Sequence, residues 1–169
     1  MRVYLPATTT VLRTLVDDGR LTGPSTAFAV TPALREFYAL SEAEADTEEL
    51  EYAALLAAAR ASLRLLDVDP FAARRRVVLA ADVADDSVSP IDDPDERGAV
   101  RIEGDVELRS VASAHLDGAD AEKDVQAAVA VVLEADLGSD DAQFVVDQAE
   151  GHELAWYATQ EIGPALELL

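Results

Sequence analysis

Arginine side chains carry the clearest chemistry in this sequence. Arg74, Arg75 and Arg76 form its one basic run, and Arg60 and Arg64 are spaced to share one face of a helix. Guanidinium groups hold phosphate through paired hydrogen bonds, so these side chains could together form an anion-binding site. With the arginine and the tyrosine of the first predicted strand, the candidate set is Arg2, Tyr4, Arg60, Arg64, Arg74, Arg75 and Arg76.

The same arginines also have a purely structural interpretation. In a chain with 34 acidic residues, each guanidinium group has carboxylates within reach. A basic run directly before the apolar strand predicted at 77–81 also protects that strand against aggregation. The sequence leaves both interpretations open, and the structural one requires no ligand.

The two histidines, His115 and His152, do not form a metal-binding pattern. A metal site needs several converging ligands, and neither histidine belongs to a ligand-spaced motif such as His-Glu-x-x-His. His115 stands on a predicted strand, and His152 follows a predicted helix end, where a cation complements the helix dipole. We therefore expect structural roles for both, and no metal or other cofactor.

Residues 93–98, Asp-Pro-Asp-Glu-Arg-Gly, resemble the start of a calcium-binding loop. Aspartates occupy its first and third positions, and Gly98 occupies the sixth. Arg97 then stands at the fifth position, where an oxygen ligand is needed, and Gly104 stands where the bidentate glutamate belongs. The pattern therefore does not predict a calcium site.

Local motifs of catalysis or nucleotide binding are missing from the sequence. The chain has no Gly-x-Ser-x-Gly, no phosphate-binding glycine loop and no dinucleotide fingerprint. Trp156 and Tyr157 remain of interest because neighbours on a strand point to opposite faces, which leaves one ring free to contact a partner. The sequence thus gives enzyme chemistry no support and offers these two aromatic residues as partner contacts.

The helix predicted at 47–66 is the most clearly marked element. Leucines and alanines recur along it at helical spacing. Asp46 and Glu49 resemble a capping box at its start, after a polar interruption at 41–46. A helix with apolar residues on nearly all of its faces belongs at the centre of a core. The residues predicted to be core are Leu55, Leu56, Leu63, Val78 and Leu79.

Strands and further helices share the rest of the chain. Hydroxyl residues before periodic segments predict helix starts at Thr8 and Ser139, and an acidic loop fills residues 84–98. Together the elements predict an α+β fold in one domain, residues 1–169, with a mixed sheet of five to seven strands and the helix 47–66 packed against it. The clearest strands are predicted at 3–5, 26–30, 77–81, 100–102 and 154–158.

Charge dominates the composition. The 13 basic residues, of which Lys123 is the one lysine, face 34 acidic residues, and the formal net charge is −21. Such a surface repels phosphate backbones and anionic membranes, so we expect no nucleic-acid partner and no membrane partner. The charge fits either high solubility or a docking surface for a basic partner protein.

The absence of cysteine excludes disulfides, thiolate zinc sites and a cysteine nucleophile. The first residues lack the apolar core of a signal peptide, and no apolar run approaches the ~20 residues of a membrane span. These features favour a cytoplasmic protein.

Five segments, spread nearly from end to end, carry a family resemblance. They are MRVYLPAT, AFAVTPALREFY, EELEYAALLAAARASLRLL, RRRVVLAADV and DDAQFVVDQAEGHELAWYATQEI. Together they are similar to a family of conserved hypothetical proteins from high-GC Gram-positive bacteria, classed as a domain of unknown function. This resemblance implies no particular activity.

A second resemblance concerns the order of the parts. A strand ending in Tyr4, a helix, the letters DGRL and then AFAVTP are similar to the opening of ADP-ribosyltransferase-like folds, a layout that RNA 2′-phosphotransferases share. VVLAADV and IEGDVELRSVASAHL look like their later strands. Leu5 replaces the histidine that those enzymes carry after the first-strand tyrosine, and their later catalytic glutamate has no match here. The resemblance therefore implies a shared layout with lost or changed chemistry.

Two functions follow as hypotheses. The first is a non-enzymatic interaction or regulatory protein, based on the acidic surface and on the lack of a catalytic motif. The alternative is a divergent ADP-ribosyltransferase-like enzyme, or a binder of a phosphate-bearing small molecule, that uses the arginine set above. The sequence names no substrate, no partner and no oligomeric state.

Overall fold

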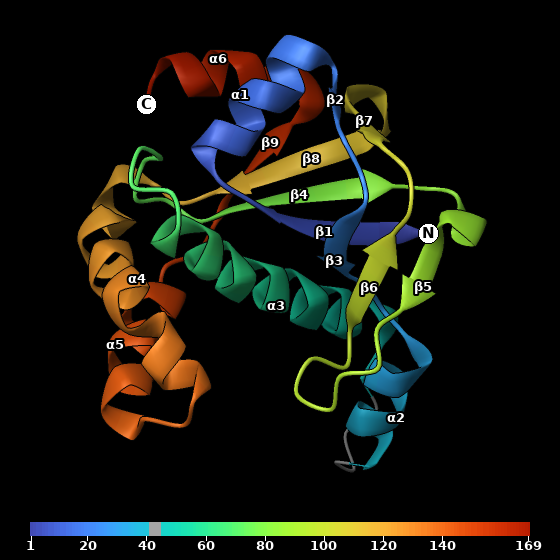
Figure 1. Ribbon diagram of the computed structural model, residues 1–169, viewed down its shortest axis with the longest axis horizontal. Coiled ribbons are helices and arrows are strands. Elements are labelled where there is room, and N and C mark those ends of the chain that lie inside the picture. The colour runs from blue at the N-terminus through green and yellow to red at the C-terminus, as the bar shows by residue number, and fades with distance from the viewer. Residues whose placement is uncertain (41–44) are drawn as a thin grey trace.

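Seven strands form one antiparallel sheet in the computed structural model, which describes residues 1–40 and 45–169 (Figure 1). The strand order is β5-β6-β3-β1-β4-β8-β9. Of the polar interruption expected at 41–46, residues 41–44 lie outside the described residues. The strands are β1 (Arg2–Ala7), β3 (Ser25–Phe28), β4 (Val77–Asp82), β5 (Val88–Pro90), β6 (Ala99–Ile102), β8 (Val111–Leu116) and β9 (Ala155–Ala158), and β2 (Arg20–Leu21) pairs separately with β7 (Val106–Glu107).

The strand pairs differ from the mixed pairing expected from the sequence, because all the pairs in the described sheet are antiparallel. Parallel neighbours would have required long crossover connections from one end of the sheet to the other. The two helices between β8 and β9 instead form a hairpin, which returns the chain to the end of the sheet that it left, so that Leu116 pairs with Ala155. The α+β class itself is confirmed.

The long helix α3 (Thr47–Asp67) lies across one face of the sheet, as Figure 1 shows. Asp46 and Glu49 form the capping box expected at its start, with each side chain accepting a hydrogen bond from the other residue's backbone N–H. Alanines on its inner face pack against Tyr4, Phe28 and strand β4. Their small side chains let the helix approach the sheet closely, which places α3 at the centre of the fold.

Helices α1 (Thr9–Asp18) and α6 (Ile162–Glu167) cover the opposite face of the sheet. Thr8 caps α1 by accepting a hydrogen bond from the Val11 N–H at 3.2 Å, as its position predicted. Gly19 ends this helix at φ 72°, a left-handed conformation that favours glycine. This face contains the largest of the three apolar clusters among the described residues, built from alternate residues of β1 and β4 together with residues of β8.

Helices α4 (Glu122–Asp136) and α5 (Asp140–Glu150) form a hairpin against the C-terminal half of α3. Leu63 and Leu66 of α3 pack there with valines and alanines of the hairpin. At the other end of α3, the short helix α2 (Pro32–Leu40) begins after Thr31, whose hydroxyl accepts a hydrogen bond from the Leu34 N–H at 3.1 Å. None of the described helices combines the length and the apolar composition that a bilayer crossing requires.

Four of the five residues predicted to be core are buried at least in part. Leu63, Val78 and Leu79 have 0% exposure, and Leu55 is half-buried. The prediction for Leu56 is wrong, because this side chain is 42% exposed. It lies on a flank of α3 that borders a small cavity instead of packing against the sheet.

Ser62 ties α3 to two strands and gives a first test of this packing. Its buried hydroxyl donates to the Ala7 carbonyl at 2.7 Å and accepts from the Val77 N–H at 3.0 Å. Ser62→Ala leaves two buried backbone groups without partners, so we expect the free energy of unfolding to fall by about 1–3 kcal/mol in urea denaturation. The exposed Ser89→Ala serves as the control, and an equal effect of both changes would contradict the bridging role.

Candidate functional site

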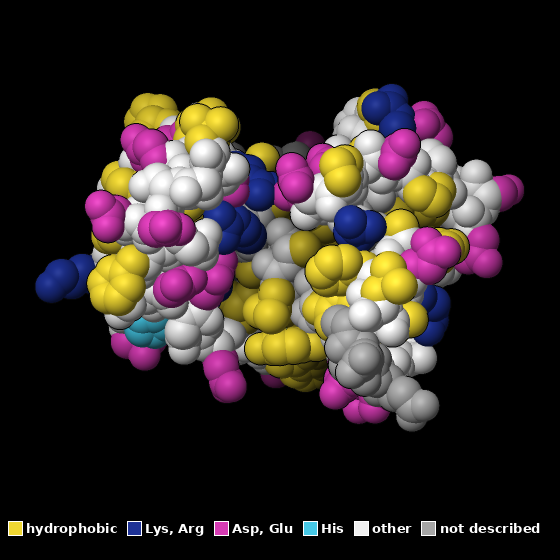
Figure 2. Space-filling view, turned by 90° about the horizontal axis from the view of Figure 1, so that it is seen from below, with side chains coloured by type: hydrophobic (Ala, Val, Ile, Leu, Met, Phe, Trp, Pro, Cys, Tyr) yellow, Lys and Arg dark blue, Asp and Glu magenta, His cyan; other side chains and the backbone are white. Residues whose placement is uncertain are grey.

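A groove of about 800 Å³ runs along α3 and is the main hollow on this face of the molecule (Figure 2). One wall comes from α2 and from the 93–98 loop, which precedes β6, and the other comes from the C-terminal end of α4. We call it the α3 groove. Its volume lies within the range of about 300–1,000 Å³ that is usual for ligand-binding sites.

The floor of the α3 groove is made of small side chains. Ala53 and Ala57 lie one helical turn apart on α3, so they form a continuous stripe along the groove. Both are half-buried, whereas Ala54 beside them is turned into the core against the sheet. A floor of alanines keeps the α3 backbone close to the surface and leaves room for large side chains from a binding partner.

One end of the groove is aromatic. Phe37 of α2 is 48% exposed there, and its ring meets the Tyr38 ring edge-on at a centroid distance of 5.7 Å. The Arg97 guanidinium carbon lies 4.9 Å from the centre of the Phe37 ring, within cation–π range. Thr31 holds α2 against the loop, because its hydroxyl also donates to the Arg97 carbonyl at 2.5 Å.

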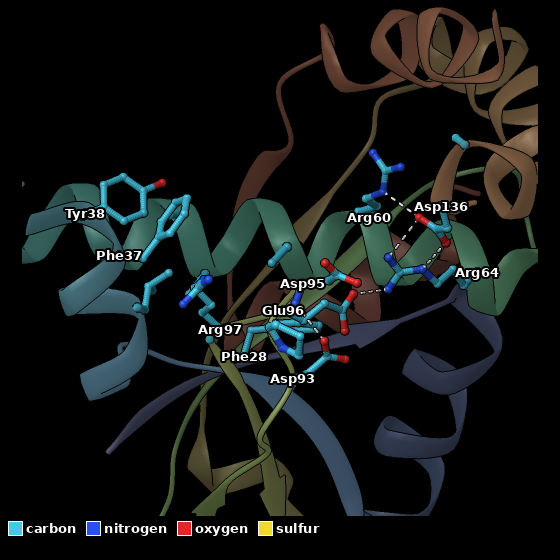
Figure 3. A pocket seen from close by; sticks show the side chains of 17 residues that line it. Phe28, Phe37, Tyr38, Arg60, Arg64, Asp93, Asp95, Glu96, Arg97 and Asp136 are labelled. Carbon is cyan, nitrogen blue, oxygen red and sulfur yellow. Dashed lines mark hydrogen bonds and ion pairs between the residues drawn. The ribbon is translucent and has the colours of Figure 1, made fainter. Parts of the chain in front are cut away.

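The other end of the groove is ionic, as Figure 3 shows. Arg64 donates to both carboxylate oxygens of Asp136, at 2.7 and 3.2 Å, and to Glu96 of the 93–98 loop at 2.5 Å. Arg60 donates to Asp136 at 3.1 Å, and it also reaches two side chains of α5. This network joins the two walls of the groove across α3.

Within this network, Arg64 and Asp136 each stabilise the charged form of the other. Burial works against the charge on Arg64, but hydrogen bonds to Asp136 and Glu96 outweigh it, so the pKa of the guanidinium lies above its ordinary value. Burial alone would raise the pKa of Asp136, yet Arg64 and then Arg60 lower it below the ordinary range of an aspartate. The carboxylate of Asp136 therefore remains ionised to a lower pH than that of an ordinary aspartate.

The lowered pKa of Asp136 makes stability depend on pH in a defined direction. Its contribution is fully present above the unfolded pKa of about 4 and is lost as the pH falls through the lower folded pKa. We expect Asp136→Asn to destabilise the protein at pH 7 and the difference from wild type to shrink on acidification. Urea denaturation at a series of pH values measures this difference, and a difference that is independent of pH would contradict the ionic role of Asp136.

The candidate anion-binding residues lie at separate places in the structure. Arg60 and Arg64 line the α3 groove, whereas Arg2 lies on β1 and forms a two-point ion pair with Asp82 at 2.8 and 3.0 Å. Tyr4 of the same strand is buried beneath α3, 7% exposed. The structure therefore brings two members of the set into the groove and leaves the N-terminal pair elsewhere.

The three side chains of the basic run 74–76 have separate partners. Arg74 donates to the Leu66 carbonyl in the last turn of α3 at 2.9 Å, and to the carbonyls of Asp69 and Ala72 in the segment that follows. Arg75 pairs with Glu122 at 2.8 Å, and the buried Arg76 pairs with Asp117 at 2.8 Å. Each guanidinium group of the candidate set is thus already engaged by carboxylate or carbonyl oxygens.

The remaining candidates are the aromatic pair of β9 and the two histidines. Trp156 is 61% exposed and Tyr157 packs against the core on the other face of β9, as strand alternation predicts. The His152 ring lies 2.7 Å from Asp124, and the His115 ring lies 3.2 Å from the Ser113 hydroxyl. Over residues 1–40 and 45–169, no three His, Cys, Asp or Glu side chains converge as metal ligands.

Phe37, Tyr38 and Asp136 were not identified as site residues from the sequence. Phe37 and Tyr38 lie near the end of α2, where an aromatic pair is equally typical of a core. The i, i+4 spacing of Arg60 and Arg64 was the one usable signal, since it placed two cations on one face of α3. Their partner Asp136 is 72 residues further along the chain than Arg64, so no local pattern connects the two.

Comparison with known families gives one result. Residues 1–166 match the model of a family described as a family of unknown function, DUF6912. Searches of curated proteins and of solved structures gave no match. The match covers nearly the whole chain and confirms the expected membership in a family of unknown function: the chain belongs to the DUF6912 family.

Proposed function

We propose that the protein is a non-enzymatic interaction protein, and that the α3 groove binds a segment of a partner protein. One observation carries this proposal. The groove combines an alanine floor, an exposed aromatic ring at one end and carboxylates fixed along its walls. A groove of this kind suits a helix or an extended segment that inserts apolar side chains and places its charges at the rim.

Phe37 is the anchor at the aromatic end. Aromatic rings dominate the energy of many protein interfaces when a partner covers them. The ring already accepts a guanidinium group, that of Arg97, against its face. The Phe37 side chain therefore suits a partner that brings an apolar side chain, a cation or both to this end.

Charge selects the partner. The net charge of −21 attracts basic proteins over long range, and Asp93 and Asp95 add carboxylates beside the groove between Arg97 and Arg64 (Figure 3). Asp95 is exposed, and its backbone N–H donates to the Asp93 carboxylate at 2.9 Å, which fixes the loop. The partner segment that this arrangement fits is basic, with at least one large apolar side chain.

The network of Arg60, Arg64, Asp136 and Glu96 serves this binding by holding the walls apart at a fixed spacing. A groove whose walls are held in place loses less conformational entropy when a partner binds than a groove with free walls. The same ion pairs occupy the guanidinium groups, so a phosphate ligand would have to displace carboxylates at both arginines. The geometry therefore favours a protein partner over a phosphate-bearing small molecule.

A selection from a random peptide library displayed on phage tests this function. We expect the enriched peptides to combine lysine or arginine with aromatic or aliphatic residues, and to lose affinity as salt is raised. Phe37→Ala is expected to weaken them about tenfold, because it removes the anchor without touching the core. Ala33→Ser, an exposed change on the same helix, is the matched control. Enrichment of acidic peptides, or equal binding by the Phe37 variant, would contradict the proposal.

A further inference from the structure

Strand β9 forms one edge of the sheet, and among the described residues it pairs with β8 alone. Its sequence, Ala-Trp-Tyr-Ala, contains no charge and no proline. The opposite edge, β5, is three residues long and ends in Pro90, which cannot donate a backbone hydrogen bond. The two edges therefore differ, since β5 is protected against further pairing by its sequence and β9 is not.

The backbone of β9 shows which of its groups face outward. The Ala158 N–H donates to the Glu161 carboxylate at 2.8 Å, so it points away from β8. In an antiparallel pair, alternate residues point their N–H and C=O groups to the same side. Trp156 stands two residues before Ala158, and its N–H and C=O therefore also point away from β8, toward the open edge.

The side chain of Trp156 lies on the same face as a cavity of about 320 Å³. Trp156 is paired with His115 of β8, and cross-strand pairs lie on one face of a sheet. His115 lines the cavity together with Tyr52 and Leu56 of α3 and with Glu153. A strand added beside β9 would place every second side chain on this face, next to Trp156 and the cavity.

The charges around the cavity favour a cation. Arg76, which lines it, is neutralised by its buried pair with Asp117. Burial lowers the pKa of His115, so the ring stays uncharged at neutral pH. Glu153 is exposed and is free of ion pairs in the described part of the chain, and the exposed Trp156 ring is a preferred surface for a cation.

We propose that β9 accepts an extended segment of a partner protein as an added strand, with a lysine or arginine of that segment between Trp156 and Glu153. Two backbone hydrogen bonds with Trp156 set the register, and the cation gives the specificity. A second copy of this chain fits less well, because two molecules with a net charge of −21 repel each other. This site does not depend on the α3 groove.

The test uses labelled peptides of alternating lysine and valine, measured by fluorescence anisotropy. We expect them to bind wild type more tightly than peptides of alternating glutamate and valine do, and more tightly than lysine peptides with N-methylated backbones do. Trp156→Ala should weaken the lysine peptide about threefold to thirtyfold, through loss of the cation–π contact. Trp156→Pro should weaken it further, because proline also removes the outward N–H while leaving the bonds to β8.

Thermal unfolding of both Trp156 variants checks that they remain folded, and Phe144→Ala, which changes an exposed aromatic residue of α5, controls for general loss of apolar surface. Failure of the lysine peptide to bind wild type would overturn the proposal. So would equal binding by the alanine and proline variants, or equal binding of the N-methylated peptide. A dimer of wild type that Trp156→Pro abolishes in sedimentation would assign the edge to a second copy, and would equally overturn it.

Discussion

Replacing Asp117 with alanine is expected to lower the free energy of unfolding by about 3–5 kcal/mol, because it leaves a buried arginine without its counter-charge. The Arg76 and Asp117 side chains are 2% and 0% exposed. Asp117 accepts hydrogen bonds at 2.8 Å from the backbone N–H and from two guanidinium nitrogens of Arg76. Arg76 also donates to the His152 carbonyl at 2.9 Å, so one pair joins β4, the end of β8 and the segment after α5.

The neighbouring pair of Arg75 and Glu122 is the matched control for this change. Glu122 is 46% exposed in that pair, and Glu122→Ala is expected to cost less than about 1 kcal/mol. Urea denaturation at neutral pH compares the two variants. A loss for Asp117→Ala no larger than that for Glu122→Ala would show that the buried charge is compensated by another group.

Leu63→Ala is expected to destabilise the protein by about 2–5 kcal/mol, the usual cost of truncating a buried leucine. Leu63 has 0% exposure and packs against Leu66 and the α4–α5 hairpin. Closing the resulting cavity would require a shift of α3 against the α4–α5 hairpin, because packed helices do not collapse freely onto a gap. The effect should therefore lie toward the upper part of the range.

Leu56→Ala supplies the comparison, because it makes the same chemical change on the same helix at a side chain that is 42% exposed. We expect it to cost less than half as much as Leu63→Ala, since folding removes far less of the Leu56 side chain than of the Leu63 side chain from solvent. Thermal and urea unfolding of the two variants measure the difference. Equal losses would mean that the flank of α3 with Leu56 is packed as tightly as the inner face.

Local signals predicted the helices well. The capping box at Asp46 and Glu49 predicted the start of α3. The leucines and alanines along the helix predicted its length, and α3 ends at Asp67, one residue past the predicted end. Thr8 and Ser139 cap α1 and α5 as expected. These signals are local because a helix satisfies its backbone within its own segment, apart from the ends that the caps complete.

The pairing of strands and the burial of Leu56 could not be predicted in the same way. Strand direction depends on where the chain returns to the sheet, and the α4–α5 hairpin decides this for β9. A helix that is apolar all round gives no sign of which flank lies uncovered. Both properties depend on contacts between segments far apart in the sequence.

The arginines show most clearly where the sequence was insufficient. Their anion-binding and structural interpretations were both compatible with the residue types, because both depend on guanidinium chemistry. What separates the two is the position of partners, and Asp136 and Asp117 are 72 and 41 residues along the chain from Arg64 and Arg76. The groove itself is likewise assembled from α2, α3, α4 and a loop.

The most direct test of the proposed function is to locate the binding site of an enriched basic peptide on the protein. Backbone amide shifts in ¹H–¹⁵N NMR spectra report this residue by residue during a titration. We predict that the shifts concentrate on α2, on residues 53–64 of α3 and on the 93–98 loop, and that they disappear with Ala57→Trp, which fills the groove. Ala130→Trp, an exposed change on α4, should leave them intact. Shifts that spare the α3 groove, or that persist in a folded Ala57→Trp variant, would contradict the proposal that the groove binds a partner segment.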